Sequence, residues 1–288
     1  VPTPVPAPTP PAVARPPDLL PGSYTAGTLH LATLQAPWLF EHSLDAKGPK
    51  LQLGPQLRLD SIGDCSTLGH CLNFSQAIAT EAGHNESASW GRFTQGKVRI
   101  HLLLLDLDKQ LQKHVGIHYL AGVPTVSMPT SGSARYVLTG ATTPTFGREG
   151  TRPTGIFSGQ GLVRFGPGTG TRIALEGQLS FGPDERYQML SHGAGFDAQG
   201  HLNHIGTTNL RMTAPNTFTG QLQVNAIGNS DAMQCGSAGG NCAASVSGAF
   251  FGQQASQLGF GYTVRNRQRN DEDHTIQGVA VMHRVDTP

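Results

Sequence analysis

Charge is scarce in this chain, and the lysines and arginines do not cluster anywhere. Charged residues make up 14% of the 288 residues, and the formal net charge is +1. Binding to nucleic acid or to an anionic membrane surface relies on clustered lysine and arginine side chains. The sequence contains no such cluster, so we predict that the protein has no nucleic-acid partner.

Long apolar runs, an initiator methionine and a secretory leader are also lacking. The most apolar stretch, HLLLLDLDKQL at residues 101–111, is interrupted by Asp106 and Asp108. A membrane-spanning helix needs about 20 consecutive apolar residues. We therefore expect no transmembrane segment in this chain. We interpret the numbered sequence as a processed form, or as an excised portion of a longer protein.

Familiar catalytic motifs are missing as well. There is no Gly-x-Ser-x-Gly elbow and no His-Glu-x-x-His motif. The segment GPGTGT at 166–171 superficially suggests a phosphate-binding loop, but no helix follows it, so we interpret it as a hairpin turn. The segment RNDEDH at 269–274 is expected to be an acidic, solvated turn, with weak calcium binding as the alternative. We predict that the protein is not an enzyme and has no cofactor.

Only four cysteines are present, and they form two close pairs, Cys65 with Cys71 and Cys235 with Cys242. Their small, glycine- and serine-rich spacers let each pair close a local disulfide loop, worth about 2–3 kcal/mol. The alternative is a zinc site, but both pairs lack the usual two-residue spacing. Disulfides would place the protein in an oxidising, extracytoplasmic compartment: the periplasm, the outer-membrane surface or the extracellular space.

Proline is abundant at the N-terminus. Residues 1–22 hold nine of the twenty prolines. Because proline fixes φ and removes N–H donors, we expect this segment to be an extended polyproline II spacer or arm. The alternative is recognition by a proline-binding domain.

Residues 23–113 predict a small β-rich domain. Apolar and polar residues alternate in 23–34 and in 50–63, as in half-buried strands. The segment LNFSQAIATEAG at 72–83 indicates a short helix. The segment from Trp90 onward, WGRFTQGKVRIHLLLL, indicates a turn that leads into a strand.

Residues 114–288 predict an antiparallel eight-stranded β-barrel. Period-two alternation recurs in several segments separated by turn signals, which is typical of antiparallel barrels and sandwiches. Glycine, at 37 residues, recurs on the apolar faces, where it lets a strand bend as barrel closure demands. The apolar faces include Phe157, Val163 and Phe165; Ile173, Leu175, Leu179 and Phe181; Phe218, Leu222 and Val224; and Ile276, Ala280 and Met282.

The segment SGAFFGQQASQLGFGYTV at 247–264 predicts a hairpin of the barrel core. Phe250 belongs to one inward-facing row, and Phe260 and Tyr262 belong to the next, with the turn at GQQAS between them. Aromatic side chains at these positions would fill the interior of an eight-stranded barrel.

This hairpin and the strand after it carry a family resemblance. The corner GQQASQLG, from Gly252 to Gly259, and the final strand with Ile276, Gly278 and Arg284 resemble the closing strands of the transferrin-binding protein B-like β-barrel domain family. Upstream segments at 90–93, 118–125 and 128–145 resemble those ahead of such barrels in bacterial proteins that begin with a FecR-type domain.

The resemblance implies a bacterial envelope or cell-surface binding protein, in which a protein or small ligand meets the barrel loops. The loops that bind transferrin in that family are not recognisable here. Three long, glycine-rich loops at 140–155, 191–204 and 228–242 are the candidates, since rigid scaffolds commonly carry binding residues in loops. Their candidate ligand-contacting residues are Arg148, Arg152, His192, His201, His204 and Asp231.

Twelve histidines raise the alternative of haem or metal binding. His114 and His118 would lie about 13 Å apart on a strand, too far for one metal ion. His201 and His204 lie in a turn and are freer to converge. Loop or surface positions are the simpler interpretation of these histidines, and we name no metal ligand.

These patterns favour a non-catalytic binding module, presented by the proline-rich arm. The main alternative is a structural subunit of an extracellular filament, sheath or matrix. Low charge and an extended arm that pairs with a neighbouring chain's sheet edge would suit such an assembly.

Overall fold

The computed structural model of the chain describes residues 19–24, 30–35, 50–66, 70–102, 105–111, 116–147, 153–207, 209–237, 240–269 and 274–285. Strands dominate these residues. The helical elements among them are two single 3₁₀ turns, η1 (Pro55–Leu57) and η2 (Gln253–Ala255). In the part of the chain so described, no helix is long and apolar enough to cross a membrane.

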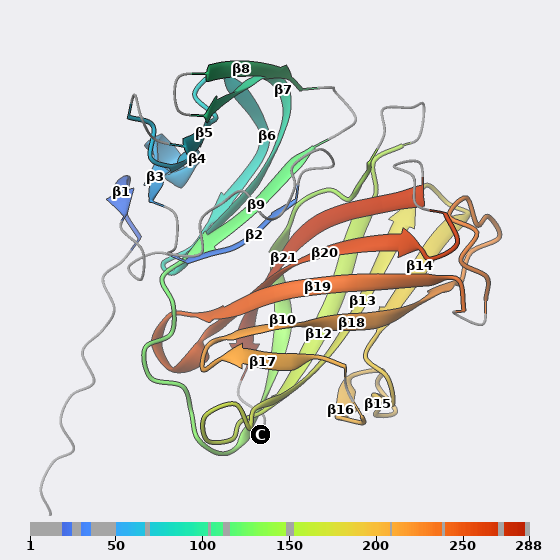
Figure 1. Cartoon of the computed structure of the whole chain (residues 1–288). Helices are drawn as coiled ribbons and strands as arrows, with labels where there is room; N and C mark the ends of the chain where they lie inside the picture. Colours follow the sequence, from blue (N-terminus) through green and yellow to red (C-terminus); the bar gives the residue numbers. More distant parts are fainter. Residues whose placement is uncertain are drawn as a thin grey trace, which may run out of the picture.

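Eight antiparallel strands close into a barrel in the second half of the chain (Figure 1). The closing contact joins the first strand to the last, with Tyr136 paired to Arg284. In order around the barrel the strands are β10 (Ser133–Ala141), β12 (Ile156–Arg164), β13 (Arg172–Phe181), β14 (Glu185–Leu190), β18 (Thr217–Ala226), β19 (Cys242–Phe251), β20 (Gln257–Asn266) and β21 (Thr275–Val285).

Short strands extend the barrel wall at its rims. Two pair with barrel strands, and two form a separate hairpin in the connection between β14 and β18. They are β11 (Thr145–Phe146) on β21, β17 (Arg211–Ala214) on β18, and the hairpin of β15 (Gly195–Phe196) and β16 (Leu202–His204).

The barrel interior is a single apolar core, as the sequence predicts. Phe157, Phe218 and Phe260 are all buried in it. The ring of Phe157 lies 6.2 Å from that of Phe260 and 5.3 Å from that of Tyr262. Every apolar row expected to face inward does so, because only that register buries one whole face of each strand. The segment GPGTGT is the turn between β12 and β13, and the core hairpin is β19–β20.

A second, open sheet is built from the first part of the chain. Its path runs β1–β3–β4–β5–β7–β9–β2, and two further strands, β6 and β8, also pair with β7. The strands are β1 (Gly22–Tyr24), β2 (His30–Gln35), β3 (Leu51–Leu53), β4 (Leu59–Gly63), β5 (His70–Asn73), β6 (Ala77–His84), β7 (Ala88–Leu102), β8 (Leu105–Gln110) and β9 (Ile117–Gly122). Since β9 hydrogen-bonds to β7 and β2, this sheet extends beyond residue 113, the boundary expected from the sequence.

Two local expectations for this sheet are wrong. Most of the segment 72–83, where a short helix is expected, belongs to strand β6 (Ala77–His84), because its side chains alternate between the two faces and Glu81 reaches Arg92 on β7. Pairing with β7 here outweighs the helix propensity of alanine and glutamate. The segment that begins at Trp90 contains the expected strand but no turn before it: Trp90 already lies within β7, a continuous strand of 15 residues.

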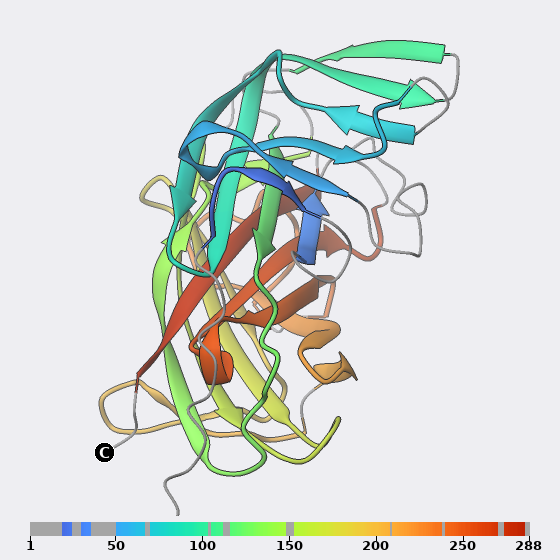
Figure 2. The same cartoon turned by 90° about the vertical axis from the view of Figure 1, so that its left-hand side faces the viewer.

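The sheet packs on the outer wall of the barrel (Figures 1 and 2). A small apolar cluster joins the two parts, with Trp90 and Leu120 from the sheet against Phe251 from the barrel. Trp90 is buried in this cluster. Its indole occupies the space that side chains would need at Gly83 on β6 and Gly140 on β10, where an added Cβ would lie 2.5 and 2.2 Å from the ring. Trp90 therefore fits in this position only because both neighbouring residues, Gly83 and Gly140, have no side chain.

Buried polar groups accompany this contact. His118 on β9 is fully buried, and its two ring nitrogens lie 2.7 Å from the hydroxyls of Thr142 and Thr145 at the barrel rim. Glu81 pairs with Arg92 at 2.6 Å and accepts the Thr143 backbone N–H, also at 2.6 Å. The sheet and the barrel are therefore joined by directional bonds as well as by apolar packing.

Candidate functional site

The three candidate ligand loops lie at two different ends of the barrel. The loop at 191–204 follows the end of β14, whereas the loops at 140–155 and 228–242 follow the ends of β10 and β18. In an antiparallel barrel β14 points opposite to both β10 and β18, so the first loop lies at the far rim from the other two. The structure therefore separates the three histidines from Asp231. Arg148 and Arg152 lie outside the described residues.

Asp231 holds its own loop together. Its carboxylate accepts the backbone N–H of Cys235 at 2.9 Å and that of Gly236 at 2.7 Å. A disulfide joins Cys235 to Cys242 a few residues further on, and a second one joins Cys65 to Cys71 in the open sheet. Both expected disulfides are confirmed. The hydrogen bonds of Asp231 serve the shape of this loop.

The three candidate histidines have different surroundings. His192 lies 3.0 Å from the amide of Gln223. His201 lies 3.3 Å from the carboxylate of Asp197, which also accepts the His201 backbone N–H at 2.8 Å. That backbone N–H, followed by the N–H of Gln199, holds the pKa of Asp197 below its usual range. His204 lies exposed on β16.

The β15–β16 hairpin carries His201 back onto the outer wall of the barrel. Leu202 and Ile205 bury themselves against Leu162 and Ala174, on β12 and β13. One side chain, Gln160 on β12, fastens the hairpin: its amide nitrogen donates to the Gly200 carbonyl at 2.8 Å, and its oxygen accepts the Leu202 N–H at 3.0 Å. A short loop segment is thereby fixed to a rigid wall.

A polar pocket of about 340 Å³ lies between this hairpin and the wall. We call it the wall pocket. It is lined by Arg135, Val137, Ser158, Gly159, Gln160, Glu176, Gln178 and His201. One guanidinium and one carboxylate give it both signs of charge. The sequence pattern placed Ser158, Gln160, Glu176 and Gln178 on the outward faces of their strands, but only the fold brings them to His201.

The two charged groups of the wall pocket differ in how they are paired. Glu176 accepts the Gln160 amide at 2.7 Å and the Gln188 amide at 3.1 Å, so both carboxylate oxygens are held in place. Arg135 is half-buried, and its side chain makes no hydrogen bond or ion pair among the described residues. Its fork of N–H donors is therefore available to a ligand.

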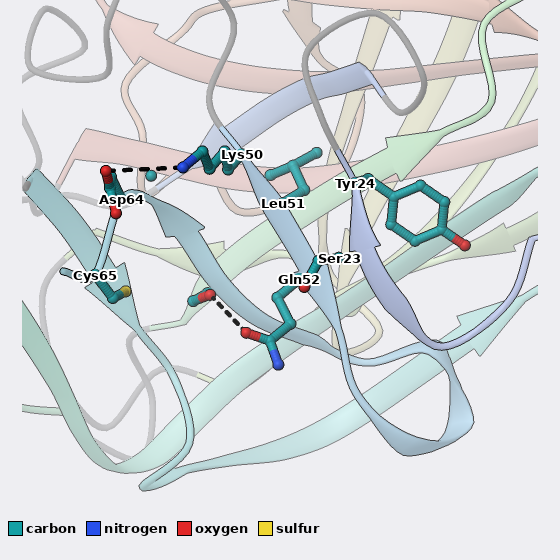
Figure 3. A pocket seen from close by; sticks show the side chains of 9 residues that line it. Ser23, Tyr24, Lys50, Leu51, Gln52, Asp64 and Cys65 are labelled. Atoms are coloured by element: carbon teal, nitrogen blue, oxygen red, sulfur yellow. Dashed lines mark hydrogen bonds and ion pairs between the residues drawn. The ribbon is translucent and has the colours of Figure 1, made fainter.

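A second pocket, of about 390 Å³, lies at the edge of the open sheet, on strands β1, β3 and β4 (Figure 3). Figure 3 shows Lys50 and Asp64 pointing toward each other across its rim; they form an exposed ion pair at 3.7 Å. Hydrogen bonds from the backbone N–H and then the side chain of Ser66, followed by the charge of Lys50, lower the pKa of Asp64. On the pocket floor, Ser61 donates to Gln52 at 3.5 Å. Because its charges satisfy each other, this pocket is the weaker candidate.

Histidine clusters do not form a metal centre among the residues that the structure describes: no three His, Cys, Asp or Glu side chains there converge closely enough to hold an ion. His118 is buried at the junction between the sheet and the barrel, and His114 lies outside the described residues. The buried position of His118 could not be predicted from the sequence, because its partners lie 24 and 27 residues further along the chain.

These features define the protein as a closed, aromatic-filled β-barrel that carries an open β-sheet on its wall and a polar pocket under a rim hairpin. No protein-family model matches the chain, and no curated protein matches it either.

Solved structures of transferrin-binding protein B are distantly similar in fold. A double mutant of the Haemophilus parasuis protein matches over 84% of this chain and 40% of its own, with 16% identity and a TM-score of 0.39. The protein from serogroup B Neisseria meningitidis matches over 90% and 44%, with 12% identity and a TM-score of 0.38. The chain thus spans about 40% of the length of the structures that it matches.

Proposed function

We propose that this chain is a non-catalytic binding module of the bacterial envelope or cell surface, and that its ligand contacts the barrel at the β15–β16 hairpin. The observation that carries the proposal is the clamp formed by Gln160, which fixes the hairpin on the wall and leaves a polar pocket beneath it. A loop held on a rigid scaffold is how many binding proteins present their contact residues.

The two disulfides support an extracytoplasmic location as part of the same proposal, since such bonds persist in oxidising compartments. The low and balanced charge supports a partner other than nucleic acid or an anionic membrane surface. Association with FecR-type envelope proteins also belongs to this proposal.

Replacing Gln160 with alanine tests the proposal. The whole chain, immobilised, is exposed to extracts of the organism's natural surroundings, and retained components are identified. We expect Gln160→Ala to reduce retention of a component at least tenfold, because the hairpin loses two hydrogen bonds to the wall. Faster exchange of the Leu202 amide hydrogen would report that release directly.

Gln221→Ala is the matched control. Gln221 also faces outward from a barrel strand, but it lies on β18, is exposed, and does not line the wall pocket. The Gln221→Ala variant should retain the component as the parent chain does. Equal retention by Gln160→Ala, with the hairpin demonstrably released, would move the binding surface elsewhere. No retained component at all would contradict a binding role.

Assembly through the proline-rich arm is the second candidate, and one observation favours it. Leu19, close to the end of the arm, is buried in the core of the open sheet and donates its N–H to the Glu86 carbonyl. Strand β1, three residues further on, lies at one end of the sheet path. The arm would thus leave from a sheet edge. Sedimentation would decide: fibres lost on deleting residues 1–18 support assembly, whereas a monomer at high concentration refutes it.

A further inference from the structure

The lining of the wall pocket is mostly hydrophilic. Among the eight described residues that line it, Val137 is the only large apolar one, and no Phe, Tyr or Trp is present. A pocket that binds an apolar or aromatic ligand is lined mainly by apolar and aromatic side chains. The volume of about 340 Å³ suits a ligand of about the size of one sugar ring with its substituents.

The positive charge of Arg135 favours a ligand with a negatively charged group. A half-buried guanidinium without a partner presents several N–H donors in a planar fork, which matches a carboxylate in bidentate geometry. Glu176 on β13, which is separated from β10 by β12, places a carboxylate in the same pocket. A doubly charged anion such as phosphate would be repelled by it, whereas a single carboxylate near Arg135 would not need to approach it.

The other lining groups favour hydroxyls. The Gln178 amide nitrogen donates to Ser180 at 3.3 Å, so its carbonyl oxygen remains able to accept from a ligand. Each oxygen of Glu176 accepts one amide and has a lone pair left for a further donor. Ser158 and His201 add groups that can donate or accept. This set needs several ligand O–H groups, more than a small amino acid offers.

We propose that the wall pocket binds an acidic sugar, with the sugar carboxylate on Arg135 and its hydroxyls on Glu176, Gln178 and His201. This inference rests on the proposed binding function and names its ligand class. The pocket is prearranged for the purpose, because Gln160 and Asp197 hold the hairpin, and Gln160 and Gln188 hold Glu176. Such preorganisation reduces the entropic cost of binding.

Titration of the whole chain with sodium glucuronate, followed by calorimetry or ligand-observed NMR, tests the proposal. We expect saturable binding, no binding of glucose at the same concentrations, and weak or no binding of inorganic phosphate. Arg135→Gln should weaken glucuronate binding at least tenfold, because it removes a charge-assisted bidentate contact. Arg211→Gln, which removes an exposed guanidinium on β17 outside the pocket, should leave the affinity unchanged.

Several outcomes would overturn the proposal: no saturable glucuronate binding by the parent chain, equal binding by Arg135→Gln, or binding of L-serine in place of glucuronate. Thermal unfolding of both variants confirms that they remain folded. If glucuronate fails while the hairpin-dependent component of the extract is still retained, the ligand class is wrong and the binding function stands. If both fail, the function is wrong too.

Discussion

Phe260→Ala is expected to lower the free energy of unfolding by about 3–5 kcal/mol, the range found when a large buried side chain is truncated. Phe260 is 1% exposed, and its ring packs against those of Phe157 and Tyr262 at 6.2 and 6.4 Å between centroids. The rings and strands around it are tied into a closed barrel, so they cannot collapse into the space that the ring leaves. Urea unfolding followed by near-ultraviolet circular dichroism measures the change.

Phe196→Ala is the matched control, because Phe196 is 38% exposed on the rim hairpin and outside the barrel core. Its effect should stay within about 0.5 kcal/mol, as is usual for surface substitutions. A loss below about 1 kcal/mol for Phe260→Ala would mean that the interior is not the single packed core on which the barrel depends.

The barrel could be predicted because burial acts on one face of each strand. In β13, Ile173, Leu175, Leu179 and Phe181 all face the core, and a slip of one residue would turn the whole row to solvent. The sequence therefore records both the strand and its orientation.

The open sheet was harder to predict, because its strands are stabilised by partners distant in sequence. Residues 77–84 have alanine and glutamate, which suit a helix as well as a strand, and only the pairing of β6 with β7 decides. The strand β9 was hard to delimit for another reason. One of its faces lies in the core of the open sheet and the other lies against the barrel, so all six residues are buried and no alternation marks where the first part ends.

The wall pocket shows why a site is less visible in sequence than a fold. Its lining comes from three strands and from a hairpin about 40 residues away from the glutamine that clamps it. Alternation indicated that Ser158 and Gln160 face outward, but outward-facing polar residues are normal on any barrel. Arg148 and Arg152 lie outside the described residues, and of the other four residues chosen from the loops only His201 lines this pocket.

Acid is expected to destabilise the protein through His118. Burial, followed by the nearby Arg92 guanidinium, lowers the pKa of His118 from 6.5 to about 3. Below pH 6.5 the unfolded chain therefore binds a proton that the folded chain does not accept until about pH 3. Stability contributed by neutral His118 is complete above pH 6.5 and falls by about 1.4 kcal/mol for each pH unit below it. At pH 4.5 the loss is about 3 kcal/mol.

His118→Gln removes the titration and leaves a side chain that can still reach a threonine hydroxyl. Its own stability at pH 7 is not the readout, because the loss of two close contacts to Thr142 and Thr145 lowers it in any case. The slope is the readout: between pH 6.5 and 4.5 the parent chain should lose about 3 kcal/mol more than the variant, measured by urea unfolding at each pH. Groups with acid-range pKa values, such as Asp64 and Asp197, are common to both proteins and cancel. If stability falls equally with pH in the parent chain and the variant, His118 accepts a proton in the folded state. The contact between the sheet and the barrel would then be open to water at His118.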